Sequence, residues 1–150
     1  MEIFTVNPKG SLLVSGDIDD WGLVRERRVE AIVDMDGGVD PGVPQAPNEL
    51  IYIYFPIIDD RLPDLRKLNV LGRLVADLVR TEQVVLVHCR LGLNRSNLVV
   101  GTALTYLGMS GAEAVERLQQ LRPGALYNEI FARYLRELPA RLVPDRFGLP

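Results

Sequence analysis

Residues 84–96 read Val-Val-Leu-Val-His-Cys-Arg-Leu-Gly-Leu-Asn-Arg-Ser. The apolar residues at the start predict a buried β-strand, and the apolar residues that follow Ser96 predict a helix. The stretch therefore predicts a strand that ends in a tight loop and continues as a helix. Cys89 lies where the strand ends and is the only cysteine of the chain. Unpaired N–H groups and the positive end of the helix dipole favour a thiolate or a phosphate at that point.

The spacing between Cys89 and Arg95 suits the binding of a tetrahedral oxyanion. The residues between them are Arg90, Leu91, Gly92, Leu93 and Asn94. A loop of this length can curl around an anion and present successive backbone N–H groups to it, while the guanidinium of Arg95 binds two oxygens in a fork. We expect Gly92 to allow a close backbone approach. We expect Asn94 to accept left-handed backbone angles where the loop turns into the helix.

Two neighbours of the loop are expected to act on the sulfur. Ser96 offers a hydroxyl that can donate a hydrogen bond to Cys89. His88 is the only histidine of the chain, and the sequence has no cluster of Cys and His with metal-ligand spacing. We therefore expect the imidazole to hydrogen-bond the loop backbone and to tune the sulfur, with no metal bound. The alternative for Cys89 alone is a small buried hydrophobic residue.

At these residues the chain resembles the cysteine-dependent protein phosphatases, in particular the compact dual-specificity group and its bacterial relatives. Their signature is His-Cys-x-x-Gly-x-x-Arg-Ser/Thr, and residues 88–96 match it in full. Residues 55–64 resemble the general-acid loop of the family, Pro-Ile-x-Asp-Gly-x-x-Pro-Asp, with Asp60 where glycine is common. Residues 121–124, Leu-Arg-Pro-Gly, resemble its Arg-Pro element, and the resemblance extends over most of the chain.

The resemblance implies a protein tyrosine phosphatase-like fold and a role for each site residue. Cys89 would attack phosphorus and form a phosphocysteine intermediate, while Arg95 and the loop amides would hold the phosphate oxygens. Asp59 occupies the position of the family's general acid, and the adjacent Asp60 is the alternative. A solvated turn is the other interpretation of either carboxylate. Substrates would be phosphorylated proteins or small phosphomonoesters, and no cofactor is expected.

The hydrophobic pattern predicts an α/β fold with a central, mostly parallel sheet of four to five strands flanked by helices. Strands are expected over residues 3–6, 12–15, 31–35, 51–55 and 84–87. Apolar residues at helical spacing between Leu65 and Val79 predict a helix, and the apolar run 98–109 predicts a buried one. Ser110 and Glu113 form a capping box that opens a further helix ending near Leu121. A last helix is expected around 130–135.

Length and composition predict one domain over residues 1–150. A hydrophobic content of 47% is enough for one sizeable core. The formal net charge of −3 argues against a sequence-independent grip on nucleic acid. One cysteine leaves no intramolecular disulfide, which suits a reducing cytoplasm. The sequence shows neither a secretory signal nor an apolar run long enough to cross a membrane, and it does not indicate an oligomeric state.

The stretch from Asp34 to Asp40 reads Asp-Met-Asp-Gly-Gly-Val-Asp. It resembles a calcium-binding loop only in part, because the bidentate Glu and the later ligands are missing, so we expect a polar turn after a strand. Residues 37–47 form the one long irregular stretch, which is either a rim of the phosphate pocket or a plain surface connection. Asn128 is a candidate for positioning water or the acid loop.

Other functions remain open at this point. The Gly-Leu-Asn-Arg-Ser core resembles that of RNA 5′-triphosphatases of the same superfamily, although the acidic net charge and Asp59 argue against RNA. A lipid phosphatase, a non-catalytic phosphate-binding module and a sulfurtransferase-like loop are further alternatives. In the family that the chain resembles, strict phosphotyrosine enzymes build a deep cleft with an extended N-terminal loop. This chain offers little material for such a loop, so a shallow pocket is expected.

Overall fold

A computed structural model describes residues 1–141 of the chain and has the predicted α/β architecture. Its sheet has five strands in the order β1-β2-β5-β3-β4, where β1 is antiparallel to β2 and the other neighbouring pairs are parallel. The strands are β1 (Ile3–Thr5), β2 (Leu12–Ser15), β3 (Ala31–Asp34), β4 (Ile51–Tyr54) and β5 (Val85–His88). The five predicted strands are therefore confirmed to within one residue at each end.

The helices are α1 (Trp21–Glu26), α2 (Leu65–Arg80), α3 (Arg95–Tyr106), α4 (Gly111–Leu121) and α5 (Glu129–Arg136). The capping box at the start of α4 is confirmed, because Ser110 accepts from the Glu113 N–H while the Glu113 carboxylate accepts from the Ser110 N–H. The short helix α1 is not apparent from the sequence pattern, since Val24 is its one buried residue. Among the described residues, no helix is long and apolar enough to cross a membrane.

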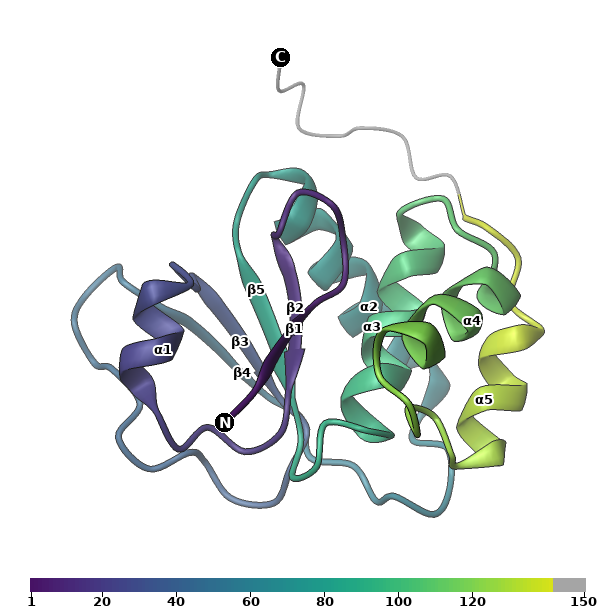
Figure 1. Cartoon of the computed structure of the whole chain (residues 1–150), viewed down its shortest axis with the longest axis horizontal. Coiled ribbons are helices and arrows are strands. Elements are labelled where there is room, and N and C mark those ends of the chain that lie inside the picture. Colours follow the sequence, from purple (N-terminus) through teal and green to yellow (C-terminus); the bar gives the residue numbers. More distant parts are fainter. Residues whose placement is uncertain (142–150) are drawn as a thin grey trace.

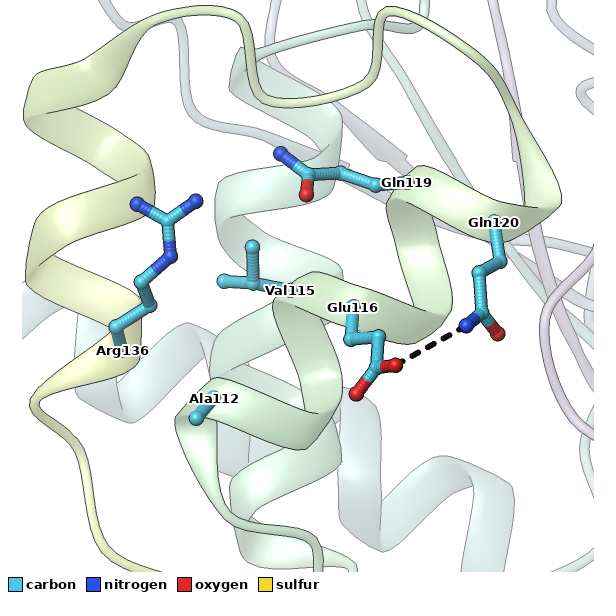
Figure 2. Close-up of a pocket in the computed structure, with 6 residues that line it drawn as sticks. All are labelled: Ala112, Val115, Glu116, Gln119, Gln120 and Arg136. Atoms are coloured by element: carbon cyan, nitrogen blue, oxygen red, sulfur yellow. Dashed lines mark hydrogen bonds between the residues drawn. The ribbon is translucent and has the colours of Figure 1, made fainter.

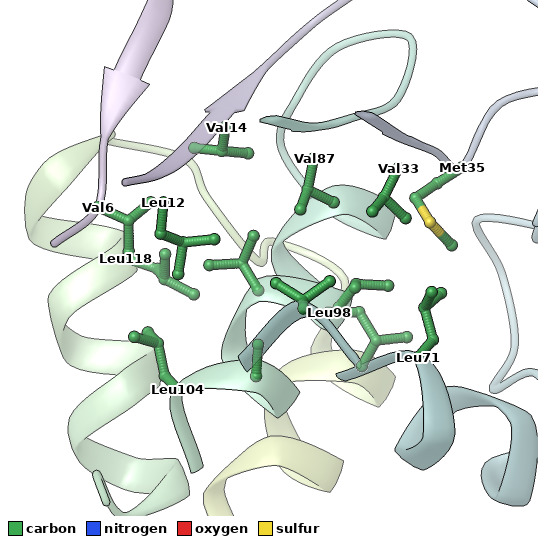
Figure 3. Close-up of a cluster of buried hydrophobic side chains, with 14 of the residues drawn as sticks. Val6, Leu12, Val14, Val33, Met35, Leu71, Val87, Leu98, Leu104 and Leu118 are labelled. Atoms are coloured by element: carbon green, nitrogen blue, oxygen red, sulfur yellow. The ribbon is translucent and has the colours of Figure 1, made fainter. Parts of the chain in front are cut away.

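The sheet is covered unequally on its two faces. Helices α2, α3, α4 and α5 pack on one face and the short α1 on the other (Figure 1). Alternate residues of the central strands point to opposite sides, as strand geometry requires. Val14, Val33 and Val87 belong to the larger core under the four helices (Figure 3), whereas Ile32 and Leu86 belong to the smaller core under α1.

Helix α3 lies at the centre of the helical layer and explains the apolar run 98–109 in the sequence. All of its residues from Ser96 to Thr105 are buried, because α2, α4 and α5 surround it. Gly72 of α2 allows close contact, since a Cβ atom there would lie 2.5 Å from Cγ2 of Thr102. The helix begins at Arg95, three residues before the predicted apolar run. Its N-terminus is thereby held rigidly beside the end of β5.

The topology brings several loops together at one edge of the sheet. Strand β5 is inserted between β2 and β3, so the carboxyl ends of these parallel strands lie side by side (lower edge in Figure 1). Ligands of open α/β sheets bind outside the carboxyl ends of the strands where the chain order switches in this way. The loop that follows β5 is residues 89–94, so the fold places the sequence motif at that edge.

Candidate active site

Cys89 lies directly after β5 with its side chain turned into the loop. The residue is 2% exposed, and its Sγ atom lies 3.3 Å from Oγ of Ser96. Ser96 is fully buried in the first turn of α3. The predicted contact between the serine hydroxyl and the sulfur is therefore present, and the hydroxyl can donate to a thiolate.

The loop carbonyls of residues 90–93 all accept hydrogen bonds from the surrounding protein. The Arg90 carbonyl accepts from the Asp17 N–H, and the Leu91 and Gly92 carbonyls accept from Nη1 of Arg122 at 2.7 and 2.9 Å. The Leu93 carbonyl accepts from the Leu126 N–H. Within residues 1–141, none of the backbone N–H groups of residues 90–94 donates to a protein acceptor. The loop thus presents free donors to whatever lies above the sulfur.

The left-handed backbone of the loop is at Gly92, with φ +66°, and not at Asn94. The expectation for Asn94 was wrong, because this residue has φ −110° and ψ −69° in the right-handed region. A Cβ atom on Gly92 would lie 2.5 Å from the carbonyl of Ser15, so the glycine allows the loop to lie close to the end of β2. Asn94 stands at the N-cap position of α3 but makes no side-chain cap, so the first N–H groups of the helix stay free.

Arg95 is held by a carboxylate that the sequence analysis had placed in a turn. Its Nη1 atom donates to Oδ1 of Asp36 at 2.7 Å, and its Nε atom is buried with no partner. Burial alone would lower the pKa of Arg95, but the hydrogen bond to Asp36 and the negative charges of Cys89, Asp36 and Asp59 outweigh burial and raise it. The guanidinium is therefore a permanent cation beside Cys89 with one unsatisfied donor.

Asp59 is joined to both the loop and α5. Its Oδ2 atom accepts from Nδ2 of Asn94 at 3.0 Å, and its Oδ1 atom accepts from Nδ2 of Asn128 at 3.2 Å. Asn128 in turn donates its backbone N–H to Oδ1 of Asn94 at 3.0 Å. Among the two candidate acids, Asp59 is the one that lies against the loop. Asp60 instead lies at the surface, where it pairs with Arg61 at 3.7 Å.

His88 does not bind the loop backbone, so that expectation was wrong. The fully buried imidazole lies beside β3, and its Nε2 atom is 2.7 Å from Oδ2 of Asp40 and 3.6 Å from Oδ1 of Asp34. Strand register explains the contact, since Asp34 is the direct neighbour of His88 across β3 and β5. Asp34 is itself fully buried at the end of β3 and accepts from the Tyr52 hydroxyl. Bends follow at residues 36–38, as the expected polar turn after a strand requires.

Asp34, Asp40 and His88 lie close enough together to be considered as metal ligands. Their ligand atoms fall within 4.8 Å of one another. Nε2 of His88 hydrogen-bonds Oδ2 of Asp40, and the Tyr52 hydroxyl also reaches that oxygen at 3.0 Å, whereas Nδ1 of His88 is buried with no partner among the described residues. Burial, reinforced by the charge of Asp34, raises the pKa of Asp40 although His88 opposes it. The cluster therefore ties the start of the 37–47 loop to the strand that carries Cys89.

Sequence reasoning missed three residues that shape the loop. Asp36 was noted only as part of a turn, and Asn97 was not singled out at all. Nδ2 of Asn97 donates to the carbonyls of Gly92 and Leu93 at 3.0 and 2.9 Å. The third residue is Arg122, which the sequence indicated only as part of the Leu-Arg-Pro-Gly element. Its side chain reaches from the end of α4 to the loop and stacks on Phe4. A polar residue inside an otherwise apolar helix was the available signal for Asn97.

A separate hollow lies on the helical side of the molecule. It has a volume of about 300 Å³ and lies along α4, with Arg136 of α5 at one side (Figure 2). Two of the lining residues are joined by a hydrogen bond, in which Gln120 donates to Glu116. The residues that line the hollow come from α4 and α5 and not from the Cys89 loop, so it is not part of the candidate site.

Comparison with solved structures gives close matches to phosphatases. Tk-PTP in its active form has a TM-score of 0.74 and 26% identity, over 93% of this chain and 97% of that chain. Human DUSP28 has a TM-score of 0.72 and 27% identity, over 89% of this chain and 90% of that chain. The chain is therefore similar, in fold and in sequence, to tyrosine and dual-specificity phosphatases. It is accordingly a hydrolase of the phosphatase class.

Other comparisons give a more distant match or none. A human protein described as tyrosine phosphatase-like serine/threonine/tyrosine-interacting protein has a TM-score of 0.71 at 17% identity, which shows a shared fold alone. No protein-family model matches the sequence, and no curated protein sequence matches it. The similarity to phosphatases therefore comes from solved structures.

Proposed function

We propose that the chain is a metal-independent phosphomonoesterase that acts on phosphorylated proteins, with Cys89 as nucleophile, Arg95 and Ser96 in support and Asp59 as general acid. The observation that carries the proposal is the buried Nε atom of Arg95, which has no partner. A buried unsatisfied donor on a cation is costly, and a phosphate oxygen is the group that would satisfy it. The free N–H groups of residues 90–94 point to the same ligand.

The reaction follows from the positions of these groups. The Cys89 thiolate attacks phosphorus, the sulfur–phosphorus bond forms and the ester oxygen–phosphorus bond breaks, while Asp59 gives its proton to the departing oxygen. Water then attacks the phosphocysteine and loses its proton to the Asp59 carboxylate. The sulfur–phosphorus bond breaks, Cys89 returns as a thiolate and inorganic phosphate leaves. Arg95 and the loop amides stabilise the charge on the equatorial oxygens in both steps.

The surroundings of the site support a protein substrate. Large apolar side chains adjoin the site residues and remain exposed: Ile58 beside Asp59 is 55% exposed, Leu91 of the loop 55% and Tyr127 beside Asn128 59%. Such side chains suit contact with a polypeptide, whereas a polyanionic RNA end requires clustered cations. The formal net charge of −3 agrees with this choice. We propose activity on phosphotyrosine together with phosphoserine and phosphothreonine.

The test is hydrolysis of an aryl phosphate in excess EDTA, with vanadate as inhibitor. We expect turnover without added metal, inhibition by vanadate and a loss of roughly 10⁴-fold or more in Cys89→Ser. The variant keeps the size of the side chain, so it should still bind tungstate. Rapid mixing should give a burst of one leaving group per chain as the phosphocysteine accumulates. Activity that requires a metal would contradict the mechanism.

The substrate class is tested by comparing three kinds of phosphate. Phosphopeptides carrying tyrosine, serine or threonine phosphate, phosphoinositide in detergent micelles and 5′-triphosphorylated RNA are offered at equal concentration. We expect the highest kcat/KM for phosphopeptides. Preference for the lipid or for RNA would reassign the substrate while leaving the cysteine mechanism in place. Binding of phosphopeptide without any turnover would indicate a phosphate-binding module instead.

A further inference from the structure

A hollow with mostly apolar walls lies at the outer edge of the sheet, between β4 and α2. It has a volume of about 420 Å³. The residues that line it come from the end of β4 and from one face of α2: Ile53, Tyr54, Phe55, Arg66, Lys67, Val70, Leu71 and Leu74. Tyr54, Val70 and Leu74 are 42%, 68% and 41% exposed. Apolar side chains that gather in this way at a surface are typical of a site that binds a partner.

A second hollow, of about 290 Å³, continues the first toward the proposed active site. The two hollows share Phe55 and Lys67 in their walls. The second hollow extends along the acid loop to Ile58, which is 55% exposed and directly precedes Asp59. The two hollows together are called the edge groove below. Because the edge groove ends beside the proposed general acid, a polypeptide that lies in it reaches the proposed active site.

The edge groove carries positive charge that its own walls do not neutralise. Arg66 and Lys67 line it, and within the described part of the chain neither side chain pairs with a carboxylate. Asp64 is the one acidic residue in the walls, and its carboxylate accepts the backbone N–H groups of Arg66 and Lys67 as the N-cap of α2. A ligand that offers carboxylates therefore complements the groove.

Strand β4 adds main-chain groups to the edge groove, because it is the last strand of the sheet on this side. The N–H groups of Ile51 and Phe55 donate to carbonyls of the neighbouring segment, residues 30–34. Since main-chain groups alternate between the two sides of a strand, those of Tyr52 and Tyr54 point outward. No other strand of the described chain pairs with this outer side. An extended peptide uses such groups when it adds a strand to a sheet.

We propose that the edge groove binds an extended segment of the substrate polypeptide, rich in apolar and acidic residues and adjacent in sequence to the phosphorylated residue. The inference rests on the proposed function and adds a feature by which a protein substrate is selected. The segment pairs with β4 and places alternate apolar side chains in the hollows. Its carboxylates lie beside Arg66 and Lys67.

Two other occupants agree less well with these observations. A second copy of the chain, bound through the same face, would bring Arg66 and Lys67 against the same cations of the other copy. A symmetric interface must complement itself, which this face does not. A membrane surface would match the cations and the apolar side chains, but it offers no partner for the outward main-chain groups of β4.

The first measurement is direct binding of a fluorescently labelled, unphosphorylated peptide of about ten residues with alternating valine and glutamate. Its affinity should fall roughly 5-fold or more in Lys67→Glu, which repels the glutamates, and in Val70→Ser, which removes apolar area. The matched control is Lys9→Glu, because Lys9 is exposed in the turn between β1 and β2 and the charge change is the same. This control should bind as the wild type does. A peptide with lysine in place of glutamate should not bind.

The second measurement is turnover of a phosphotyrosine peptide, alone and extended by the same valine–glutamate segment at its amino or carboxyl end. In the wild type, kcat/KM should be roughly 10-fold higher for the better extended peptide, because docking raises the effective concentration of the phosphate at Cys89. The ratio of extended to short peptide should fall toward about 1 in Lys67→Glu and stay at the wild-type value in Lys9→Glu. A wild-type ratio near 1 would overturn the inference while leaving the cysteine mechanism in place.

The binding measurement also distinguishes the other occupants. Peptide binding that Lys67→Glu and Val70→Ser both leave unchanged would overturn the inference. A dimer in sedimentation that Val70→Ser dissociates, or binding to phosphatidylserine vesicles, in place of peptide binding would reassign the groove to a second copy or to a membrane. The labelled peptide has no phosphate, so docking is detected independently of catalysis. Peptide binding by a chain that hydrolyses no phosphate ester would support the groove and contradict the proposed function alone.

Discussion

Oδ2 of Asp59 accepts a hydrogen bond from Nδ2 of Asn94 at 3.0 Å, which joins the proposed acid to the loop that surrounds the nucleophile. The two residues are separated by α2 and β5 in the sequence. Asn128 completes a triangle, because it contacts both of them. The acid loop is thereby held over the Cys89 loop by the side-chain amide of Asn94 in that loop and by that of Asn128 at the start of α5.

Replacing the acid should affect poor leaving groups most. Asp59→Asn cannot protonate the departing oxygen, so we expect kcat for an alkyl phosphate to fall roughly 100-fold or more. Nitrophenyl phosphate, whose leaving group needs little protonation, should be slowed much less. The measurement is the ratio of the two rates in the variant and in the wild type. Asp60→Asn is the matched control and should leave the ratio unchanged; an effect on Asp60→Asn alone would move the acid to that residue.

Asn128 has two functions that different substitutions can separate. Its Oδ1 atom accepts from the N–H groups of Ile130 and Phe131 and caps α5, while its Nδ2 atom donates to Asp59. Asn128→Asp keeps a good cap but loses the amide donor, so we expect near wild-type stability with reduced kcat. Asn128→Ala loses both and should also cost about 1 kcal/mol of unfolding free energy. Full activity in Asn128→Asp would exclude a positioning role for the amide.

Gly92 and Gly10 allow backbone strain to be distinguished from steric contact. Both have positive φ, +66° and +74° respectively. An added Cβ atom meets nothing within 4 Å at Gly10, but at Gly92 it lies 2.5 Å from Ser15 and 2.7 Å from Nη1 of Arg122. Each Gly→Ala should carry a strain of roughly 1–3 kcal/mol, measured by denaturant unfolding. Only Gly92→Ala should also lose tungstate binding, and equal effects of the two variants would contradict the close approach.

Asp36 and Asp40 should give opposite pH dependences of stability. The pKa of Asp36 is lowered mainly by Arg95 against the effect of burial, so its contribution is present above the unfolded pKa of about 3.9 and is lost as pH falls through the lowered value. The pKa of Asp40 is raised by burial, so its contribution is complete below about 3.9 and is lost as pH rises through the raised value.

The corresponding measurement is denaturant unfolding of Asp36→Asn and Asp40→Asn between pH 3 and pH 7. The stability of the wild type minus that of Asp36→Asn should increase with pH. The same difference for Asp40→Asn should decrease with pH. If the two stability differences changed with pH in the same direction, the opposite pKa shifts of Asp36 and Asp40 would be contradicted.

The sequence by itself determined the features that depend on neighbours along the chain. The strand, loop and helix around Cys89 follow from the apolar residues before it, the spacing to Arg95 and the apolar run after Ser96. The five strands and the capping box at Ser110 follow from local periodicity and local side-chain to backbone hydrogen bonds in the same way. These features need no knowledge of how distant segments meet.

Only the tertiary structure decided which distant side chains reach the loop. Asp36 and Asn128 are ordinary turn or cap residues by their local sequence. They reach Arg95 and Asp59 because β3 and β5 end, and α5 begins, at the same edge of the molecule. His88 was assigned the wrong partner for the same reason, since its neighbour Asp34 is set by the register of β3 and β5. A polar side chain is satisfied by whichever group the packing brings within about 3 Å, and that choice is not encoded locally.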